Sequence, residues 1–582
     1  MTTCSKPYQF LGYWGYNQEP ELSSILGHSL TIRGIIKDSQ ITWGVAYIGS
    51  QVSSSDRYSK HEELIIASSS AGGNPDSPDA WVKVQGDSLI LGREPFGRVP
   101  LYWTVREQAI WFASRLQLLL PIIETPQVSI PGLYGYSCFS YVPTPLTPVA
   151  DIFAVPAGTQ LSFTSPSPLT YTTHRLHEWR EAPVLIQDEN EARAQLQTLL
   201  KDAIHREITH LPSEPVGVFL SGGIDSSTVA ALLVQAGVKV RAYALDFSPV
   251  LPNNSLSELP LAQQVADFLH IPLVKVEVTP QKIRKAIARA AVALDLPFGD
   301  GATLPLFLLG EVASLETSVI FNGENGDQLF AGWTNKPLIA ASVYNTENPA
   351  GAKDFNQHYL DTFHALYGYE AQSYQPDVYA RVQTLNPQDW LQEALDPTFC
   401  SDLLARLRRA SLMLKGAQNI QPRANNLALS QGLWARSPFC DFNLTEWTFQ
   451  LPGEFLLQGA CEKYILKRAV ESWLPPEVVW REKQGMAVPI TALCLNSLRS
   501  EVRSWLSPSR LRAQGIWQPQ LAYRTLSGEL GGRTRGGRIG RILWLLMMWQ
   551  VWQSTILGEV ETPGLGRFFY DLFYLPPCHP KR

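Results

Sequence analysis

Short apolar runs separated by Gly, Pro, Ser and Asn fill roughly the first 175 residues of the chain. Examples are SLTIRGII, TWGVAYIG, AWVKVQ, SLILGRE, PLYWTV and AIWFAS. Runs of this length, rich in β-branched and aromatic side chains and bounded by turn-forming residues, are typical of strands. This part of the chain is therefore predicted to be rich in β-structure.

The pattern changes near residues 174–187, where the chain becomes polar and then helical. Asp188 and Glu191 form the D-x-x-E pattern of a capping box, and apolar residues then recur at helical spacing. A chain of 582 residues is also longer than one hydrophobic core usually spans. We therefore expect one domain at residues 1–180 and a second at 181–582.

Apolar strands and amphipathic helices alternate in the next part of the chain. The expected strands are 216–220, 238–246, 273–278 and 318–321, with helices at 228–235, 261–269 and 282–294. This alternation predicts an α/β domain with a parallel sheet and helices on both faces. Ligands of such sheets bind outside the carboxyl ends of the strands, so chemistry is expected after those ends. Beyond about residue 335 the chain is predicted to be mostly helical.

Composition and charge exclude several classes of protein. Apolar residues make up 45% of the chain and charged residues 17%, as in globular proteins. The net charge of −5 gives no general affinity for nucleic acid or an anionic membrane. The seven cysteines are scattered and form no C-x-x-C pair, which argues against a disulfide framework or a zinc site. With no secretory signal pattern at the start, we expect a cytoplasmic protein.

One apolar run, at residues 542–552, could be mistaken for a membrane span. Its eleven residues fall well short of the ~20 that a spanning helix needs, so we expect a buried helix and no membrane span. Before this run, arginines alternate with glycines at Arg533, Arg535, Arg538 and Arg541. We interpret this segment as a solvated loop, with binding of an acidic segment as the alternative.

The first predicted strand of the sheet runs directly into a glycine- and serine-rich loop. The loop reads Ser221-Gly222-Gly223-Ile224-Asp225-Ser226-Ser227, and a helix follows at once. Glycines let backbone N–H groups approach an anion, the helix N-terminus adds its positive dipole end, and serine hydroxyls donate to phosphate oxygens. A carboxylate would repel phosphate, so Asp225 is predicted to act as a ligand of Mg²⁺.

This loop resembles the PP-loop of enzymes that cleave ATP between the α and β phosphates, and further motifs resemble the asparagine-synthetase superfamily. Asn322-Gly323-Glu324-Asn325-Gly326-Asp327-Gln328-Leu329-Phe330-Ala331-Gly332 is similar to that superfamily's S-G-E-G-x-D-E-x-F-G-G. The resemblance implies that Asp327 is the second Mg²⁺ ligand. It also implies that Glu324 faces the reacting centre, as a base for the attacking amine or as an orienting group.

Three later segments carry the same resemblance. They are R-S-P-F-C-D at 436–441, E-K-Y-I-L-K at 462–467 and W-R-E-K-Q-G at 480–485. The resemblance implies that Lys463 binds pyrophosphate and that Lys483 stabilises the reacting centre. It places adenosine against Leu220, Leu245 and the backbone of Asn322 and Gly323. ATP and Mg²⁺ are therefore the expected co-substrate and metal.

The N-terminal part resembles the class II glutaminase domain, whose fold is of the Ntn-hydrolase-like αββα kind. The similar segments are 89–102, 141–145 and 155–158. Such a glutaminase uses a mature N-terminal cysteine, whereas this chain begins Met1-Thr2-Thr3-Cys4 and lacks the N-G-E-I-Y-N and R-L-S-I sequences that bind glutamine. We expect a degenerate domain that keeps the fold, with Thr2 as an alternative nucleophile.

A second departure is Trp434, where the superfamily has Glu. It indicates either a reshaped acceptor pocket or simple repacking of the core.

Two relatives without a working glutaminase use an amine already present in the substrate, namely β-lactam synthetases and lasso-peptide cyclases. The former have Tyr at the position of Glu324 and a partner Glu upstream, which residues 421–426 do not supply. The leading hypothesis is therefore a lasso-peptide cyclase that closes a macrolactam in a linear core peptide. A leader peptidase and a leader-recognition protein are its candidate partners. The alternatives are an ammonia-dependent asparagine synthetase, another small-molecule amide ligase, or a catalytically silent binding protein.

Overall fold

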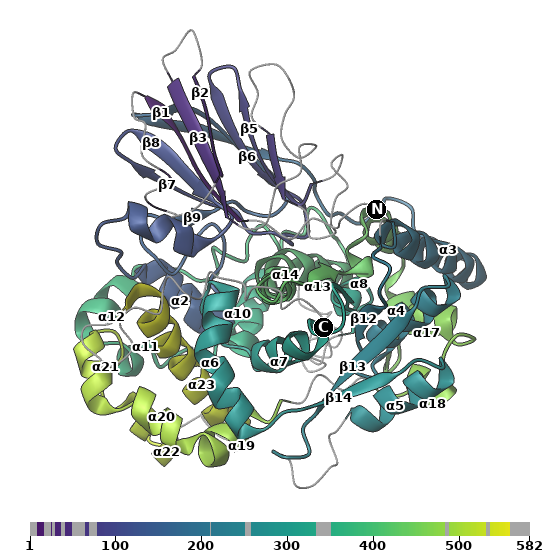
Figure 1. Ribbon diagram of the computed structural model, residues 1–582. Coiled ribbons are helices and arrows are strands. Elements are labelled where there is room, and N and C mark those ends of the chain that lie inside the picture. Colours follow the sequence, from purple (N-terminus) through teal and green to yellow (C-terminus); the bar gives the residue numbers. More distant parts are fainter. Residues whose placement is uncertain are drawn as a thin grey trace, which may run out of the picture.

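We describe the fold from a computed structural model. The described residues are 9–16, 22, 25, 30–35, 41–48, 65–68, 78–209, 211–250, 258–332, 351–482, 488–530 and 536–558. Two antiparallel sheets form the N-terminal part, and a parallel sheet surrounded by helices forms the rest (Figure 1).

The first N-terminal sheet has the order β2-β3-β1-β8-β7-β9, and the second has the order β11-β10-β6-β5-β4. The strands of the first are β1 (Gln9–Tyr16), β2 (Leu30–Ile35), β3 (Ile41–Ile48), β7 (Tyr102–Arg106), β8 (Ala109–Ala113) and β9 (Phe153–Ala154). Those of the second are β4 (Ile65–Ser68), β5 (Ala80–Gln85), β6 (Ser88–Arg93), β10 (Thr159–Pro166) and β11 (Leu169–Arg175). All six strands predicted from the apolar runs are confirmed.

The two N-terminal sheets pack face to face because their strands alternate. In β5 every second residue is buried, and Val82 meets Leu91 of β6 and Leu161 of β10 in one core. Phe10, Trp14 and other residues of the first sheet complete this core. A short helical turn η2 (Leu116–Ile122) and helix α2 (Ile130–Phe139) lead from the sheets toward the second part of the chain.

The parallel sheet has the order β14-β13-β12-β15-β16. Its strands are β12 (Val216–Phe219), β13 (Val240–Asp246), β14 (Leu273–Glu277), β15 (Val319–Phe321) and β16 (Trp434–Arg436). The four predicted strands are present, and β16 is a fifth that the sequence pattern did not reveal. The chain adds strands to one side of β12 and then to the other, so a topological switch point lies between β12 and β15.

Helices cover both faces of this sheet, as predicted. Ala242 and Ala244 of β13 face a core formed with α3 (Glu189–Glu207), α4 (Ile224–Gln235), α5 (Leu259–Phe268) and α17 (Tyr464–Val470). Tyr243 points to the opposite face, against α7 (Thr303–Ala313) and α14 (Gln421–Leu429). Side chains that alternate between two apolar cores explain why these strands read as continuous apolar runs. Asp188 caps α3, accepting a 2.9 Å hydrogen bond from the Glu191 N–H as the capping pattern predicts.

Further helices complete the second part. They include α6 (Pro280–Leu294), α8 (Gly326–Leu329), α10 (Gly351–Phe363), α13 (Leu403–Ser411), the π-helical segment η3 (Leu412–Ile420), α20 (Arg499–Trp505) and α23 (Gly537–Trp552). The predicted buried helix at 542–552 is the core of α23, where all eleven residues are buried. In the part of the chain that the structure describes, no helix is both long and apolar enough to cross a membrane.

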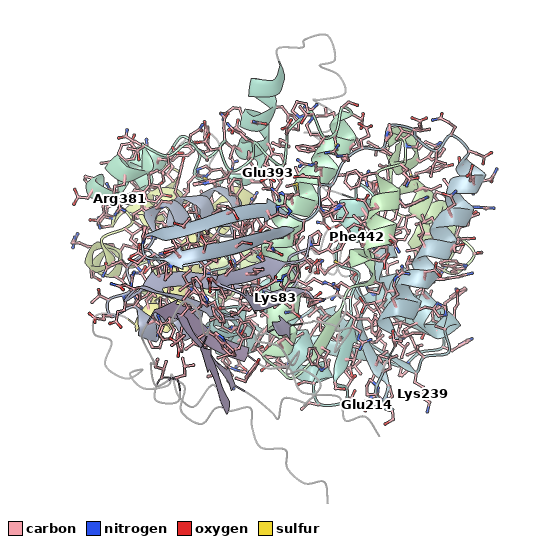
Figure 2. All side chains as sticks on the ribbon, turned by 90° about the horizontal axis from the view of Figure 1, so that it is seen from above. Lys83, Glu214, Lys239, Arg381, Glu393 and Phe442 are labelled. Carbon is pink, nitrogen blue, oxygen red and sulfur yellow. The ribbon has the colours of Figure 1, made fainter. Side chains whose placement is uncertain are left out.

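The N-terminal part is fastened to the second part through Asp295, a fully buried residue at the end of α6. Its carboxylate accepts hydrogen bonds from the backbone N–H groups of Leu116 and Gln117 and from the Gln117 amide. Arg115 lies 3.4 Å from the same carboxylate. At the opposite border Arg175 of β11 pairs with Glu393, which Figure 2 labels near the N-terminal sheets.

Candidate functional site

The loop after β12 is held in shape by its own serines. Ser221 Oγ and Ser226 Oγ lie 3.1 Å apart, the Gly223 N–H donates to Ser221 Oγ, and Ser226 Oγ donates to the Gly223 carbonyl. Gly222 has φ +76°, and a β-carbon on it would stand 2.6 Å from the Ala262 nitrogen of α5. Only glycine fits this backbone conformation against so close a neighbour. The chain therefore turns sharply from β12 into α4.

Helix α4 begins at this loop with an open N-terminus. Gly223 is the N-cap residue and supplies no side-chain cap. The first-turn N–H groups of a helix have no partner within the helix and carry the positive end of its dipole. With twelve residues behind it, this end of α4 suits a phosphate.

The loop after β15 approaches the same point from the other side of the switch. Asn322 Oδ1 accepts hydrogen bonds from the Glu324 N–H and from Ser437 Oγ. Asn325 has φ +82° and donates from its side chain to the Phe439 carbonyl at 2.8 Å. These contacts fix the turn that brings Asp327, in the first turn of α8, next to Asp225 in the first turn of α4.

Lys463 lies between these two aspartates. Its ammonium group contacts Asp225 Oδ2 and lies 2.5 Å from Asp327 Oδ1, and its side chain is only 1% exposed. Gly332 packs directly over it, because a β-carbon on Gly332 would stand 1.8 Å from Lys463 Cε. Two carboxylates from different loops thus converge on one buried positive charge.

The donor set fits Mg²⁺ bound together with phosphates. Among the described residues no three His, Cys, Asp or Glu side chains form a metal cage. Mg²⁺ that is shared with a nucleotide needs only one or two protein carboxylates, since phosphate oxygens and waters complete its octahedron. Asp225 and Asp327 supply that number, beside an open helix N-terminus.

These loops line a pocket of about 580 Å³. On the side of β12 and β13 its wall is apolar and includes Phe219, Leu245 and Leu259, with Leu306 and Leu309 of α7 opposite. The adenine ring of ATP is flat and presents two aromatic faces, so this apolar wall and the adjacent phosphate-binding loop together match ATP.

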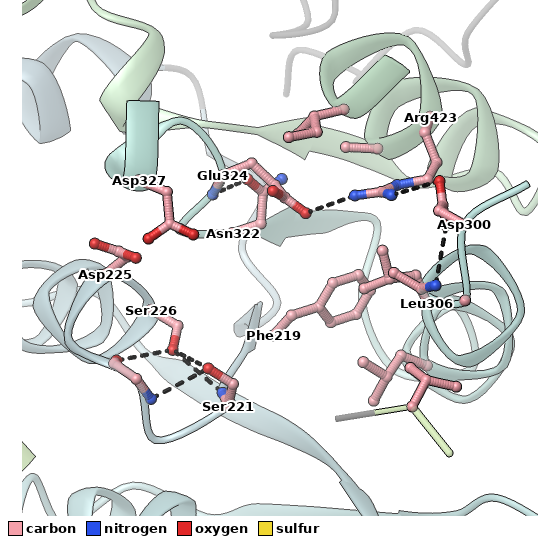
Figure 3. Close-up of a pocket in the computed structure, with 18 of the residues that line it drawn as sticks. Phe219, Ser221, Asp225, Ser226, Asp300, Leu306, Asn322, Glu324, Asp327 and Arg423 are labelled. Carbon is pink, nitrogen blue, oxygen red and sulfur yellow. Dashed lines mark hydrogen bonds and ion pairs between the residues drawn. The ribbon is translucent and has the colours of Figure 1, made fainter. Parts of the chain in front are cut away.

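The other end of the pocket holds a chain of three charged side chains. The Arg423 guanidinium of α14 lies 3.0 Å from Asp300 Oδ2 and 3.3 Å from Glu324 Oε1. Figure 3 shows this chain across the pocket from the facing carboxylates of Asp225 and Asp327. We call Asp300, Arg423 and Glu324 the acceptor cluster. Helix α14 thus supplies Glu324 with an arginine partner.

The charged forms of Asp300 and Arg423 stabilise each other within the acceptor cluster. Burial would raise the pKa of Asp300, but Arg423, the Asn419 amide and the Thr303 N–H hold it below its ordinary value. Burial would lower the pKa of Arg423, yet Asp300 and Glu324 raise it. Lys415 of η3 also lines the pocket. Glu324 therefore faces a permanently charged guanidinium.

Asp300, Arg423, Lys415 and Arg481 were not predicted from the sequence. Arg481 pairs with Glu258 at 2.8 Å, and its guanidinium lies 3.9 Å from where a β-carbon on Gly223 would stand. It therefore adds a positive charge next to the phosphate-binding loop. Its place inside the quoted W-R-E-K-Q-G motif was an available signal, as was the carboxylate between two glycines at Asp300.

Most of the predicted site residues come together in the pocket. Those that line it are Leu220, Ser221, Gly223, Asp225, Ser226, Leu245, Asn322, Gly323, Glu324 and Asp327. Lys463 lies behind the two aspartates, while Gly222 packs on α5 and Ser227 is fully buried within α4. Lys483 and the N-terminal Met1-Thr2-Thr3-Cys4 lie outside the described residues, as do Arg533 and Arg535. The roles assigned to all these residues stay predictions.

Two interpretations change with the structure. Trp434 is buried in the core beside β15 and does not line the pocket, so core repacking explains it. Arg538 and Arg541, which we had interpreted as part of a solvated loop, donate to the backbone carbonyls of Asp361 and Phe363 at the end of α10. That interpretation is wrong for these two arginines because the last carbonyls of a helix attract such donors.

Comparison with known proteins agrees with this site. The family model "Asparagine synthase" matches residues 195–554, and "Glutamine amidotransferase domain" matches residues 80–172. Asparagine synthetase [glutamine-hydrolyzing] 1 of Bacillus subtilis is 23% identical over 83% of this chain and 78% of its own length. Asparagine synthetase B [glutamine-hydrolyzing] of Escherichia coli is 22% identical over 73% of this chain and 63% of its own length.

Among solved structures, an NH3-dependent NAD synthetase from Campylobacter jejuni aligns with 36% of this chain and 96% of its own at 16% identity. Its TM-score of 0.18 is too low to bear on the fold. The family models confirm the predicted fold class, a glutaminase-like N-terminal part followed by a parallel-sheet synthetase part that continues into helices. Since the first of them spans more than half of the chain, this protein belongs to the asparagine synthase family and is an ATP-dependent amide ligase.

Proposed function

We propose that this enzyme adenylates a carboxylate of a linear peptide and closes a macrolactam with an amine of the same peptide, as a lasso-peptide cyclase does. The observation that carries the proposal is the additional apolar lining of the pocket. Besides the nucleotide-binding wall and the acceptor cluster, Tyr359, Phe363, Val488 and Ile490 line it. A peptide needs such an apolar approach, whereas free aspartate does not.

The chemistry divides between the two ends of the pocket. A carboxylate oxygen of the substrate attacks the α-phosphorus of ATP, the bond to the β-phosphate oxygen breaks, and pyrophosphate leaves. The open N-terminus of α4 and the cation of Arg481 stabilise the charge on the departing group. Mg²⁺ bound by Asp225 and Asp327 would neutralise charge on the same phosphates.

The second step forms the amide at the other end. The substrate amine attacks the carbonyl carbon of the acyl adenylate, AMP leaves, and the nitrogen loses a proton. Glu324 is the nearest candidate to accept that proton, because it points into the pocket from the β15 loop. Arg423 holds its carboxylate in place. Joining two groups of one peptide has the advantage of a high effective molarity.

The test uses the full chain with Mg-ATP and a synthetic linear peptide that has a free α-amine and one acidic side chain. We expect AMP, pyrophosphate and a product lighter by one water, and none of these from the Asp327→Asn variant. A peptide that stays linear while aspartate and ammonia are converted would refute the cyclase.

The second candidate is an ammonia-dependent asparagine synthetase. Glu324 favours it, since this residue matches the asparagine-forming pattern, and so do the relatives that the chain resembles. The same reaction mixtures separate the two, because asparagine and the cyclic peptide differ in mass.

A further inference from the structure

Lys415 is the one exposed residue between residues 403 and 441. Every other residue from 403 to 441 is buried or only partly exposed, whereas the Lys415 side chain is exposed, and it lines the pocket. It belongs to η3, whose π-helical turns change which side chains face inward. Such π-helical turns are often found at functional sites.

The other cations that line the pocket are engaged by the protein. Arg423 is held by Asp300 and Glu324, and Arg541 donates to the Phe363 carbonyl. Within the described parts of the chain the Lys415 ammonium makes neither a hydrogen bond nor an ion pair with protein. Its ammonium is therefore free to meet an anion that enters the pocket.

The charges around Lys415 place it between the two ends of the pocket. It interacts electrostatically with Asp300, Arg423 and Glu324 of the acceptor cluster and with Asp327 of the phosphate end. In the proposed reaction the carboxylate that attacks the α-phosphorus lies between the phosphate end and the acceptor cluster, while its amine partner approaches Glu324. An ammonium there offsets the repulsion between the incoming carboxylate and the protein's own acids.

We propose that Lys415 is the anchor for the carboxylate that the enzyme activates, an inference that rests on the proposed function. Nucleotide phosphate is the other anion that could reach this group. The two anions, substrate carboxylate and nucleotide phosphate, can be distinguished by the binding step that Lys415 affects. A carboxylate anchor affects the Michaelis constant of the acid substrate, and a phosphate ligand affects the binding of ATP.

The experiment compares Lys415→Met, Lys415→Arg and the control Lys239→Met, a surface lysine labelled in Figure 2. The readouts are ATP–pyrophosphate exchange against increasing L-aspartate or the linear peptide, and binding of a non-hydrolysable ATP analogue. We expect Lys415→Met to raise the KM for the acid at least about tenfold, with analogue binding within about twofold of wild type. Lys415→Arg should recover part of the loss, and Lys239→Met should behave as wild type.

Three outcomes oppose the inference. An unchanged KM for the acid in Lys415→Met would refute the role of Lys415 as an anchor and would leave the proposed function intact. Weakened analogue binding without a change in the KM for the acid assigns Lys415 to phosphate. No exchange by the wild type with either acid overturns the proposed function itself, and the anchor with it.

Discussion

Replacing Asp295 by Asn should destabilise the junction between the N-terminal part and the synthetase part. Asp295 is fully buried and sits at φ +76°, a left-handed conformation that Asn adopts at least as readily as Asp. The substitution therefore leaves the backbone and the volume unchanged and alters only what the side chain can accept. Any loss of stability then measures the contacts of the carboxylate.

Those contacts set the magnitude. One carboxylate oxygen accepts from the Gln117 N–H at 3.1 Å and the Gln117 amide at 2.8 Å, and the other accepts from the Leu116 N–H and faces Arg115. In either orientation the amide of Asn points an NH₂ group at donors. Hydrogen bonds to a buried charge contribute about 1.5–3 kcal/mol each, and breaking a buried ion pair costs about 3–5 kcal/mol. We expect a loss of about 4 kcal/mol in the free energy of unfolding.

The matched control is Asp151→Asn. Asp151 also has a positive φ, of +63°, and pairs with Arg106 at 3.1 Å, but its side chain is 67% exposed. An exposed pair of this kind contributes about 0–1 kcal/mol. Urea unfolding followed by tryptophan fluorescence gives both values, and limited proteolysis reports loosening of the junction. Equal stability of the two variants would refute the role assigned to the Asp295 carboxylate.

Three further predictions concern the pocket. Gly332→Ala places a methyl group where Lys463 Cε lies, so exchange should fall by about 100-fold or more while the fold, followed by circular dichroism, persists. Arg423→Gln removes the partner of Glu324, and amide formation should fall by about 100-fold with ATP-analogue binding retained, whereas Arg423→Lys should lose less. Because the pKa of Asp300 is lowered in the folded state, its contribution to stability is complete above the unfolded value of about 4 and is lost as the pH falls through the lowered value. The stability difference between wild type and Asp300→Asn should therefore be constant from about pH 5 to 8 and shrink in more acidic urea titrations.

The phosphate end of the site could be predicted because its chemistry is local. Ser221 to Ser227 are consecutive, and the glycines, serines and acid each have a reason to stand in one turn between a strand and a helix. The strand pattern also held wherever apolar runs were bounded by turn residues. Strand β16 was missed because its three residues, Trp434 to Arg436, lie in a part of the chain that was predicted to be mostly helical.

The acceptor cluster could not be predicted because it is assembled by the fold. Arg423 lies 123 residues from Asp300 and 99 from Glu324 in the chain. In sequence Arg423 is one cation in a helix that also carries Gln421, Asn425 and Asn426, and only the packing of α14 against the sheet brings it to the pocket. The role of Lys415 could not be predicted for the same reason, because its exposure depends on which face of η3 meets solvent.

The acceptor end of the pocket also depends on the N-terminal part. Asp295, which holds that part, lies five residues before Asp300, and between them the Gly299 N–H donates to the Ser140 carbonyl at 2.9 Å. On the other side the Thr144 N–H donates to the Gln418 side chain of η3, the segment that carries Lys415. Both segments that present charged groups to the substrate are thus braced by residues that lie between β8 and β9 of the N-terminal part. A chain that starts at α3 should therefore bind an ATP analogue more nearly as the full chain does, while its activation of an acid should fall further.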